Sequence, residues 1–121
     1  MLQTTNNKQY NLEDRTLQFA KDVIKLCKLL PNNTVNFKLI DQIVRSAASV
    51  GANYREANDT LGNKDFVYRL RISRKEAKET SFWLELILDS NPDQNKNVAI
   101  LMDECIQLRN ILSAIIAKSE K

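Results

Sequence analysis

Apolar residues recur along this chain at steps of three and four, the spacing that places side chains on one face of an α-helix. Four such segments are predicted, over residues 12–30, 36–61, 64–89 and 94–118. Only two glycines and two prolines interrupt the 121 residues, which leaves room for long elements and disfavours a fold of many short strands. The pattern therefore predicts an all-α protein, an antiparallel up-down-up-down four-helix bundle.

Each predicted helix carries one apolar stripe that is expected to face the core. In the first helix the stripe is Leu17, Ala20, Val23, Ile24, Cys27 and Leu30. In the second helix it is Ile43, Val44, Ala47, Val50, Gly51 and Tyr54. In the third and fourth helices it is Phe66, Leu70, Ser73, Ala77, Thr80, Leu84 and Leu88, then Val98, Leu101, Cys105, Leu108, Leu112 and Ile115. We expect a flexible tail at residues 1–11 and a single bundle domain at residues 12–118.

Residues with strong turn and capping preferences mark the expected helix ends. Pro31 ends the first helix, and Thr34 or Asn36 is expected to cap the second. Gly62 is expected just after the second helix in the left-handed position, with Asn63 as the next N-cap.

Gly51 lies in the middle of the second helix, on its core stripe. Glycine there costs up to about 1 kcal/mol relative to alanine. We therefore expect another helix to approach closely at this position.

The second helix also has an unusual outer face, in which short or neutral polar groups replace much of the usual Lys and Glu. This face consists of Gln42, Arg45, Ser49, Asn53, Glu56 and Thr60. The composition predicts that this face meets another surface.

The third helix carries more apolar residues than one core face can use. The additional band is Tyr68, Ile72, Phe82, Trp83 and Leu86. Five apolar residues that include three aromatic types indicate an interface, so we predict an oligomer contact. The alternative is that the tail folds over this band. The predicted oligomer interface comprises Arg45, Ser49, Asn53, Glu56, Tyr68, Ile72, Glu76, Glu79, Phe82, Trp83 and Leu86.

Three carboxylates on the second and third helices, Glu56, Glu76 and Glu79, raise the question of a di-metal site. The Glu-x-x-His elements of such bundles are absent, so no metal is expected. Pairing across helices or subunits is the preferred use of these carboxylates. The available partners are Arg45, Arg55, Arg69, Arg71 and Arg74.

The composition excludes several functional classes. The chain has no histidine, so neither a Ser-His-Asp nor a Cys-His arrangement can form, and no enzyme activity or cofactor is expected. Cys27 and Cys105 fall on apolar stripes and are expected to be buried, reduced thiols. With no apolar h-region at the N-terminus and no run of about 18 apolar residues, a cytoplasmic protein without a membrane span is expected.

The net charge of +3 is small, but the basic residues cluster. Arg71, Lys75 and Lys78 are spaced i, i+4, i+7 along the third helix. The predicted phosphate ligands are Lys64, Arg71, Arg74, Lys75 and Lys78. Arg55 and Arg69 fit either this surface or a subunit contact. On a monomer a solvated, solubilising face is the alternative, whereas repetition around a ring would create an extended basic surface.

A set of spaced residues gives the chain a family resemblance. These are Gln42, Arg45-Ser46, Ser49-x-x-x-Asn53-x-x-Glu56 and Glu76-x-x-Glu79 ahead of Trp83-Leu84. Over about Leu12 to Ala117 the chain resembles the four-helix-bundle family of bacterial 23S rRNA intervening-sequence proteins. That family also includes accessory proteins of diversity-generating retroelements. Many relatives have Ile-Ala-Glu-Gly where this chain has Tyr54-Arg55-Glu56-Ala57, and the Glu is kept.

The resemblance implies a small cytoplasmic bundle that assembles as a ring, commonly a homopentamer. It also implies binding of RNA or DNA, with a reverse transcriptase partner in the retroelement branch, and it supplies no catalytic residue. The main hypothesis is an oligomeric nucleic-acid-binding accessory protein without base-specific readout. The alternative is a protein-only adaptor that binds a partner such as a reverse transcriptase or a ribosome-associated factor.

Overall fold

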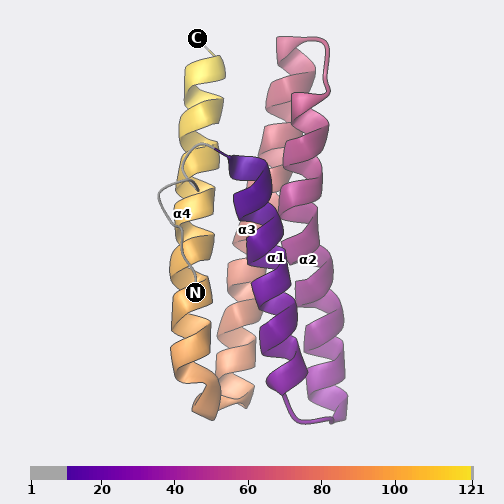
Figure 1. Ribbon diagram of the computed structural model, residues 1–121, viewed down its shortest axis with the longest axis vertical. Coiled ribbons are helices and arrows are strands. Elements are labelled where there is room, and N and C mark those ends of the chain that lie inside the picture. The colour runs from indigo at the N-terminus through magenta and orange to yellow at the C-terminus, as the bar shows by residue number, and fades with distance from the viewer. Residues whose placement is uncertain (1–10, 121) are drawn as a thin grey trace.

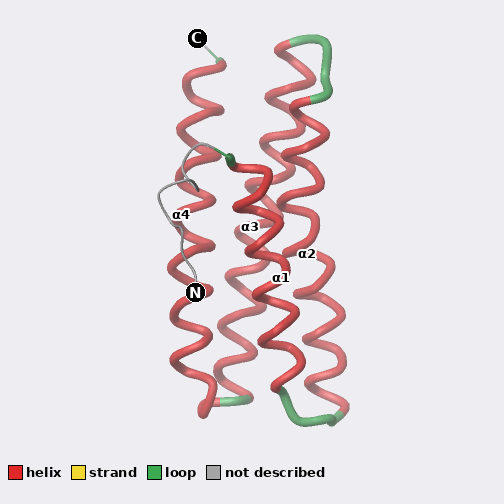
Figure 2. Tube along the Cα trace, in the orientation of Figure 1, coloured by secondary structure: helices red, strands yellow, loops and turns green. Residues whose placement is uncertain are grey.

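The computed structural model describes residues 11–120 and contains four long α-helices. They are α1 (Leu12–Leu29), α2 (Thr34–Asn58), α3 (Asn63–Ser90) and α4 (Asn95–Ser119), with a short 3-10 helix, η2 (Pro92–Gln94), before α4. Consecutive helices run in opposite directions (Figure 1), and short loops join them (Figure 2). Residues 11–120 contain no strand, so the prediction of an all-α four-helix fold is confirmed. The predicted tail lies outside the described residues except for Asn11.

Each helix packs against two neighbours. Between residues 11 and 120, α1 contacts α2 and α4 but not α3, so α1 and α3 lie diagonally across the bundle. The α2–α3 pair is the most extensive contact and the α1–α4 pair is the least extensive. The bundle therefore has one loosely closed seam, between its first and last helices.

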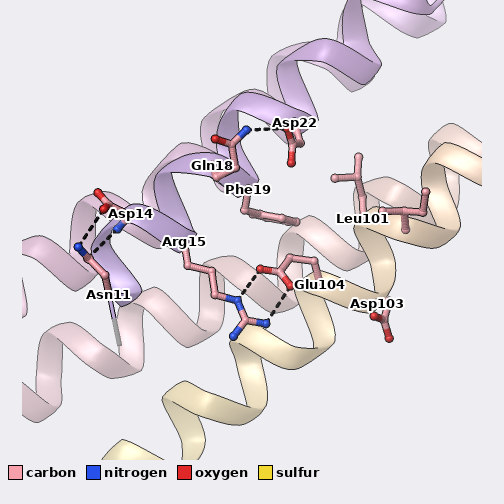
Figure 3. Close-up of a pocket in the computed structure, with 10 residues that line it drawn as sticks. Asn11, Asp14, Arg15, Gln18, Phe19, Asp22, Leu101, Asp103 and Glu104 are labelled. Atoms are coloured by element: carbon pink, nitrogen blue, oxygen red, sulfur yellow. Dashed lines mark hydrogen bonds and ion pairs between the residues drawn. The ribbon is translucent and has the colours of Figure 1, made fainter. Parts of the chain in front are cut away.

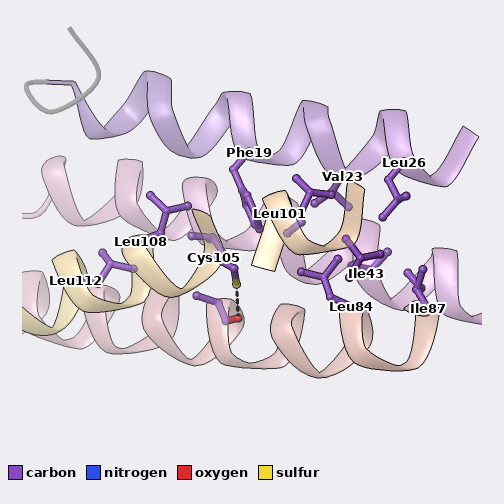
Figure 4. Close-up of a cluster of buried hydrophobic side chains, with 14 of the residues drawn as sticks. Phe19, Val23, Leu26, Ile43, Leu84, Ile87, Leu101, Cys105, Leu108 and Leu112 are labelled. Carbon is purple, nitrogen blue, oxygen red and sulfur yellow. Dashed lines mark hydrogen bonds between the residues drawn. The ribbon is translucent and has the colours of Figure 1, made fainter. Parts of the chain in front are cut away.

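Side chains from all four helices interlock in one hydrophobic core (Figure 4). Phe19, Ile43, Leu84, Leu108 and Leu112 are each at most 1% exposed. Burying a side chain of this size stabilises a fold by about 1.5–3 kcal/mol. The stripes predicted for α2, α3 and α4 face this core as expected. Their marginal members are only partly buried: Val44, Tyr54, Phe66, Leu88 and Ile115.

The stripe predicted for the first helix is partly wrong. Leu17 and Ile24 were expected in the core but are 41% and 38% exposed. The helix is rotated so that Thr16, Phe19 and Leu26 enter the core instead. Leu17 and Ile24 consequently lie at the edge of the buried face. Both residues extend the apolar arc on the same side, which shifted the predicted centre of the stripe toward them.

The close approach expected at Gly51 is confirmed. A Cβ atom added to Gly51 would lie 2.8 Å from Thr16 Oγ1 and 3.2 Å from Thr16 Cβ. Thr16 is fully buried and donates its hydroxyl to the Glu13 carbonyl at 3.1 Å. The absence of a side chain at position 51 thus lets α1 and α2 touch.

The predicted helix ends need correction. Asn33 caps α2, since its side chain accepts a hydrogen bond from the Asn36 amide, and neither Thr34 nor Asn36 is the cap. Gly62 has φ −128° and is the residue that precedes α3, so it does not occupy the expected left-handed position. Asn63 begins α3 rather than capping it. The second helix ends at Asn58, three residues before the predicted end.

The displaced start of α2 gives Asn36 a different role. Its side chain is buried and exchanges two hydrogen bonds with the Asn91 side chain, at 3.1 and 2.9 Å. Asn36 also donates to the Pro31 carbonyl, and Asn91 donates to the Ile87 carbonyl. This amide pair joins the α1–α2 loop to the α3–α4 turn at one end of the bundle.

Candidate nucleic-acid interface

The outer surface of α3 presents the predicted cationic residues. Ser73 and Ala77 of this helix are buried in the core, and the residues on the opposite side, Arg71, Lys75 and Lys78, are exposed. The spacing i, i+4, i+7 places the three cations in a row along the helix axis. The row points away from α1, which lies diagonally opposite.

A shallow depression on this surface joins the two sets of residues that the sequence predicted separately. We call it the α3 hollow. Its lining residues are Arg71, Arg74, Lys75, Lys78, Glu79, Phe82 and Trp83. The α3 hollow therefore contains four of the five predicted phosphate ligands and two of the aromatic residues predicted for an oligomer contact. Lys64, the fifth predicted ligand, is exposed near the start of α3, outside this hollow.

The cations of the α3 hollow differ in how strongly they are engaged. Arg71 forms an ion pair with Glu120, and Arg74 donates a hydrogen bond to Ser113 Oγ at 3.3 Å. Lys75 and Lys78 make no ion pair with any residue in the range 11–120. The two lysines are therefore the cations most readily available to a phosphate.

The two aromatic residues have unequal exposure. Phe82 is 55% exposed, and its ring meets that of Trp83 edge to face, with centroids 5.2 Å apart and planes at 72°. Trp83 is half-buried against the core, and its Nε1 is buried with no acceptor among the described residues. In the predicted surface band Tyr68, Phe82 and Leu86 are exposed, whereas Ile72 and Trp83 are only partly so. Phe82 is thus the ring that the α3 hollow offers to a ligand.

Ion pairing across α2 and α3 is confirmed for one of the predicted arginines. Arg45 lies 3.3 Å from Glu76 Oε1 and 3.0 Å from Glu79 Oε1. Glu76 is 8% exposed, so its charge requires this partner. Arg45 thereby holds Glu76 and Glu79 at the α2–α3 seam, where Glu79 also lines the α3 hollow.

The remaining polar residues of the predicted interface on α2 and α3 form a short series of contacts. Asn53 donates to the Ser49 carbonyl at 2.9 Å and accepts from Arg69 at 3.3 Å. The Arg69 guanidinium also lies 6.0 Å from the Tyr68 ring centroid, a cation–π distance. These contacts place Arg69 at the α2–α3 seam. Glu56, the last predicted member of this face, is exposed.

Arg55 belongs to a different side of the bundle. It lies 3.8 Å from Glu13 of α1, whereas the predicted interface follows α2 and α3. Both groups are substantially exposed, so the pair contributes little to stability.

A further ion pair was not predicted from the sequence. Arg15 of α1 donates to both carboxylate oxygens of Glu104 on α4, at 2.7 and 2.9 Å, and to Gln107 at 2.8 Å. The hydrogen bond to Glu104 raises the pKa of Arg15, against the opposing effect of burial. The partners are 89 residues apart, and no local pattern marks them.

The two cysteines are free and buried, as expected. Burial raises the pKa of Cys27 to about 11 and that of Cys105 to about 12. Cys105 donates its thiol proton to the Ala77 carbonyl at 3.0 Å (Figure 4). Both side chains are therefore neutral packing groups near pH 7.

Two further features of the described chain bear on its class. No helix within residues 11–120 is both long and apolar enough to cross a membrane. In the same range, no group of three or more cysteine, aspartate and glutamate residues is arranged to hold a metal ion.

Comparisons with known proteins identify the family. The profile of the family described as "23S rRNA-intervening sequence protein" matches residues 8–114. A crystal structure of a protein of unknown function from the S23 ribosomal protein family of Bacteroides thetaiotaomicron is 34% identical and superposes with a TM-score of 0.80. The similarity covers 88% of this chain and 98% of that chain, and neither description names an enzyme activity. No curated protein matches the chain significantly. The chain belongs to the 23S rRNA-intervening sequence protein family.

Proposed function

We propose that this protein is a non-enzymatic, ring-forming accessory protein that binds single-stranded regions of RNA or DNA through the α3 hollow. The observation that supports this most directly is the presence of four cations and an exposed phenylalanine in one depression. Cations that follow a backbone and a ring on which a base can stack are the two components of single-strand recognition. The description of the family as an rRNA-intervening sequence protein favours RNA as the ligand.

Each part of the α3 hollow has a distinct role in this proposal. Lys75 and Lys78 bind phosphates as point charges, while Arg71 and Arg74 exchange their present partners for phosphate oxygens. Phe82 stacks on a base without selecting its identity. Sequence-specific readout is not part of the proposal, because residues 11–120 contain no β-sheet that could form an aromatic platform for bases.

Assembly increases the affinity in this proposal. One copy offers a few phosphate contacts, and several copies around a ring, a pentamer in our expectation, place such sites side by side. We propose that the α2–α3 face forms the subunit contact, since Tyr68 and Leu86 there are 60% and 37% exposed.

The test of nucleic-acid binding is fluorescence anisotropy with labelled single-stranded and duplex RNA and DNA, titrated across salt. Substitution of both Lys75 and Lys78 by Glu should abolish tight binding. Loss of two phosphate contacts should lower the slope of log K against log salt by about 1.4 for a single strand. Phe82→Ala should weaken single-strand binding about tenfold, since stacking contributes about 1–3 kcal/mol per base.

A matched control separates the α3 hollow from total charge. Lys21 and Lys28 are exposed on α1, and their replacement by Glu makes the same change in net charge. This control variant should retain most of the affinity. Equal loss in both double variants, or no binding at low salt, would refute the proposed site.

The subunit contact requires a separate experiment. Tyr68→Glu together with Leu86→Glu should convert the assembly to monomers in sedimentation velocity. Leu61→Glu is the control, because Leu61 is fully exposed in the α2–α3 turn and is not one of the predicted interface residues. A monomeric wild-type protein at micromolar concentration would refute the ring, although the α3 hollow of each copy would remain testable by anisotropy.

A further inference from the structure

The loosely closed seam between α1 and α4 opens into a groove with an apolar floor (Figure 3). Phe19 and Leu101 form the floor and are buried, while Ile100 is 67% exposed beside them. A second hollow shares Asp22, Ile100 and Leu101 with the first and continues toward Leu29, which is 58% exposed. The two hollows form one continuous depression, here called the α1–α4 groove.

The rim of the α1–α4 groove is acidic. The part nearest the N-terminus of α1 is lined by four carboxylates and one guanidinium. The carboxylates are Asp14, Asp22, Asp103 and Glu104. Arg15 is committed to Glu104 by two hydrogen bonds (Figure 3), and Lys25 lies 3.9 Å from Asp22. Asp14 and Asp103 form no ion pair within residues 11–120, so these two carboxylates leave the rim acidic.

The dimensions suit a helix. From Arg15 to Leu29 the α1–α4 groove follows α1 for 14 residues, about 21 Å at 1.5 Å per residue. That length corresponds to about four turns of a third helix laid between the two. An amphipathic helix recognised in this way places apolar residues on the floor and polar residues against the rim.

We propose that the α1–α4 groove is a docking site for a cationic amphipathic helix of a partner protein. The acidic rim complements Lys and Arg on the flanks of such a helix. Ile100 and Leu29, which are exposed in the free protein, pack against its apolar stripe. The proposal does not depend on nucleic-acid binding, because it uses no residue of the α3 hollow.

A second copy of this chain is the competing occupant, since α3 carries a basic row with Phe82 beside it. Arg71 of that row contacts Glu120 at the end of α4 in the same copy. Arg74 beside it contacts Ser113 of α4. A second copy would have to break both contacts before these arginines met the acidic rim. A foreign cationic helix fills the α1–α4 groove without breaking them.

The test uses a fluorescently labelled 18-residue peptide of Leu and Lys at amphipathic helical spacing, with Glu replacing Lys in the control peptide. The Leu/Lys peptide should bind the wild-type protein and the Leu/Glu peptide should not. Asp22→Lys combined with Asp103→Lys should weaken binding at least tenfold. Glu85→Lys combined with Asp89→Lys makes the same charge change on exposed α3 positions and should weaken binding less than twofold.

A second variant distinguishes the α1–α4 groove from general attraction between opposite charges. Ile100→Ser removes an exposed apolar contact with little effect on folding, and should weaken peptide binding at least threefold. Equal effects of the two double charge reversals, or no effect of Ile100→Ser, would overturn the proposal. The proposal would also be overturned if the wild-type protein self-associates and the double variant of Asp22 and Asp103 does not. The occupant of the α1–α4 groove would then be a second copy. Nucleic-acid binding should be retained in all of these variants, which keeps this outcome separate from that of the α3 hollow.

Discussion

Replacement of Gly51 by alanine tests whether α1 and α2 touch as the structure shows. In a helix interior this change normally stabilises a protein, because alanine is favoured over glycine by about 0.8–1.0 kcal/mol. Here the new Cβ would lie 2.8 Å from Thr16 Oγ1, well inside van der Waals contact. The outcome depends on which of these two effects is larger.

Thr16 has little room to move. Its side chain is fully buried and β-branched, and its hydroxyl is held by the Glu13 carbonyl. Such a residue has few alternative rotamers, so the helices must separate or the hydroxyl must give up its hydrogen bond. Overpacking of this kind costs about 1–3 kcal/mol. After the gain in helix propensity, Gly51→Ala should lower the free energy of unfolding by about 1 kcal/mol, or the melting temperature by about 4 °C.

Urea unfolding followed by circular dichroism measures this change. Ala52→Gly, at the neighbouring exposed position, calibrates the glycine–alanine difference in the same turn of α2 and should cost about 1 kcal/mol. Thr16→Ala should be less damaging in the Gly51→Ala background than in the wild type, with a coupling of at least about 0.5 kcal/mol. If Gly51→Ala stabilises the protein by as much as Ala52→Gly destabilises it, the close approach is refuted.

Two further predictions concern buried groups. Asn36→Ala should cost about 2 kcal/mol, because it leaves Asn91 with unmet hydrogen-bonding groups, and the double alanine variant should cost less than the sum of the single variants in urea unfolding. Cys105 should be alkylated by iodoacetamide at pH 8 far more slowly than in the urea-unfolded chain, as mass spectrometry would show, and equal rates would contradict its burial. The raised pKa values of Cys27 and Cys105 mean that above about pH 9 the unfolded chain loses thiol protons that the native state retains up to about pH 11–12. The two buried thiols therefore contribute fully to stability below about pH 9, and this contribution is lost as the pH rises from about 9 to 12.

The fold was predictable because hydrophobic periodicity depends on local sequence. The stripes of α2, α3 and α4 were placed on the correct side of each helix. Their edges were less accurate, since Ile87 and Ile116 are buried where Leu88 and Ile115 were predicted. The first helix failed because Leu17 and Ile24 extend the apolar arc beyond what two neighbours can cover. Thr16 was overlooked because its burial depends on the missing side chain at Gly51, a relation between two helices.

The candidate site was predictable only in its components. The row of Arg71, Lys75 and Lys78 follows from spacing along one helix. The separate assignment of Phe82 to an oligomer contact did not anticipate that it shares a hollow with these cations. The α1–α4 groove had no sequence signal at all, since its rim combines residues about 80 positions apart, such as Asp22 and Asp103.

The distribution of charge explains why the small net charge is a poor guide to this protein. Four cations line the α3 hollow against Glu79, and four carboxylates line the α1–α4 groove against Arg15 and Lys25. A polyanion approaching the bundle is attracted to the first surface and repelled by the second, so the field orients the encounter before contact. A cationic helix is steered in the reverse sense. Because the two surfaces share no lining residue, the two proposals predict that substitutions in either surface leave binding at the other unchanged.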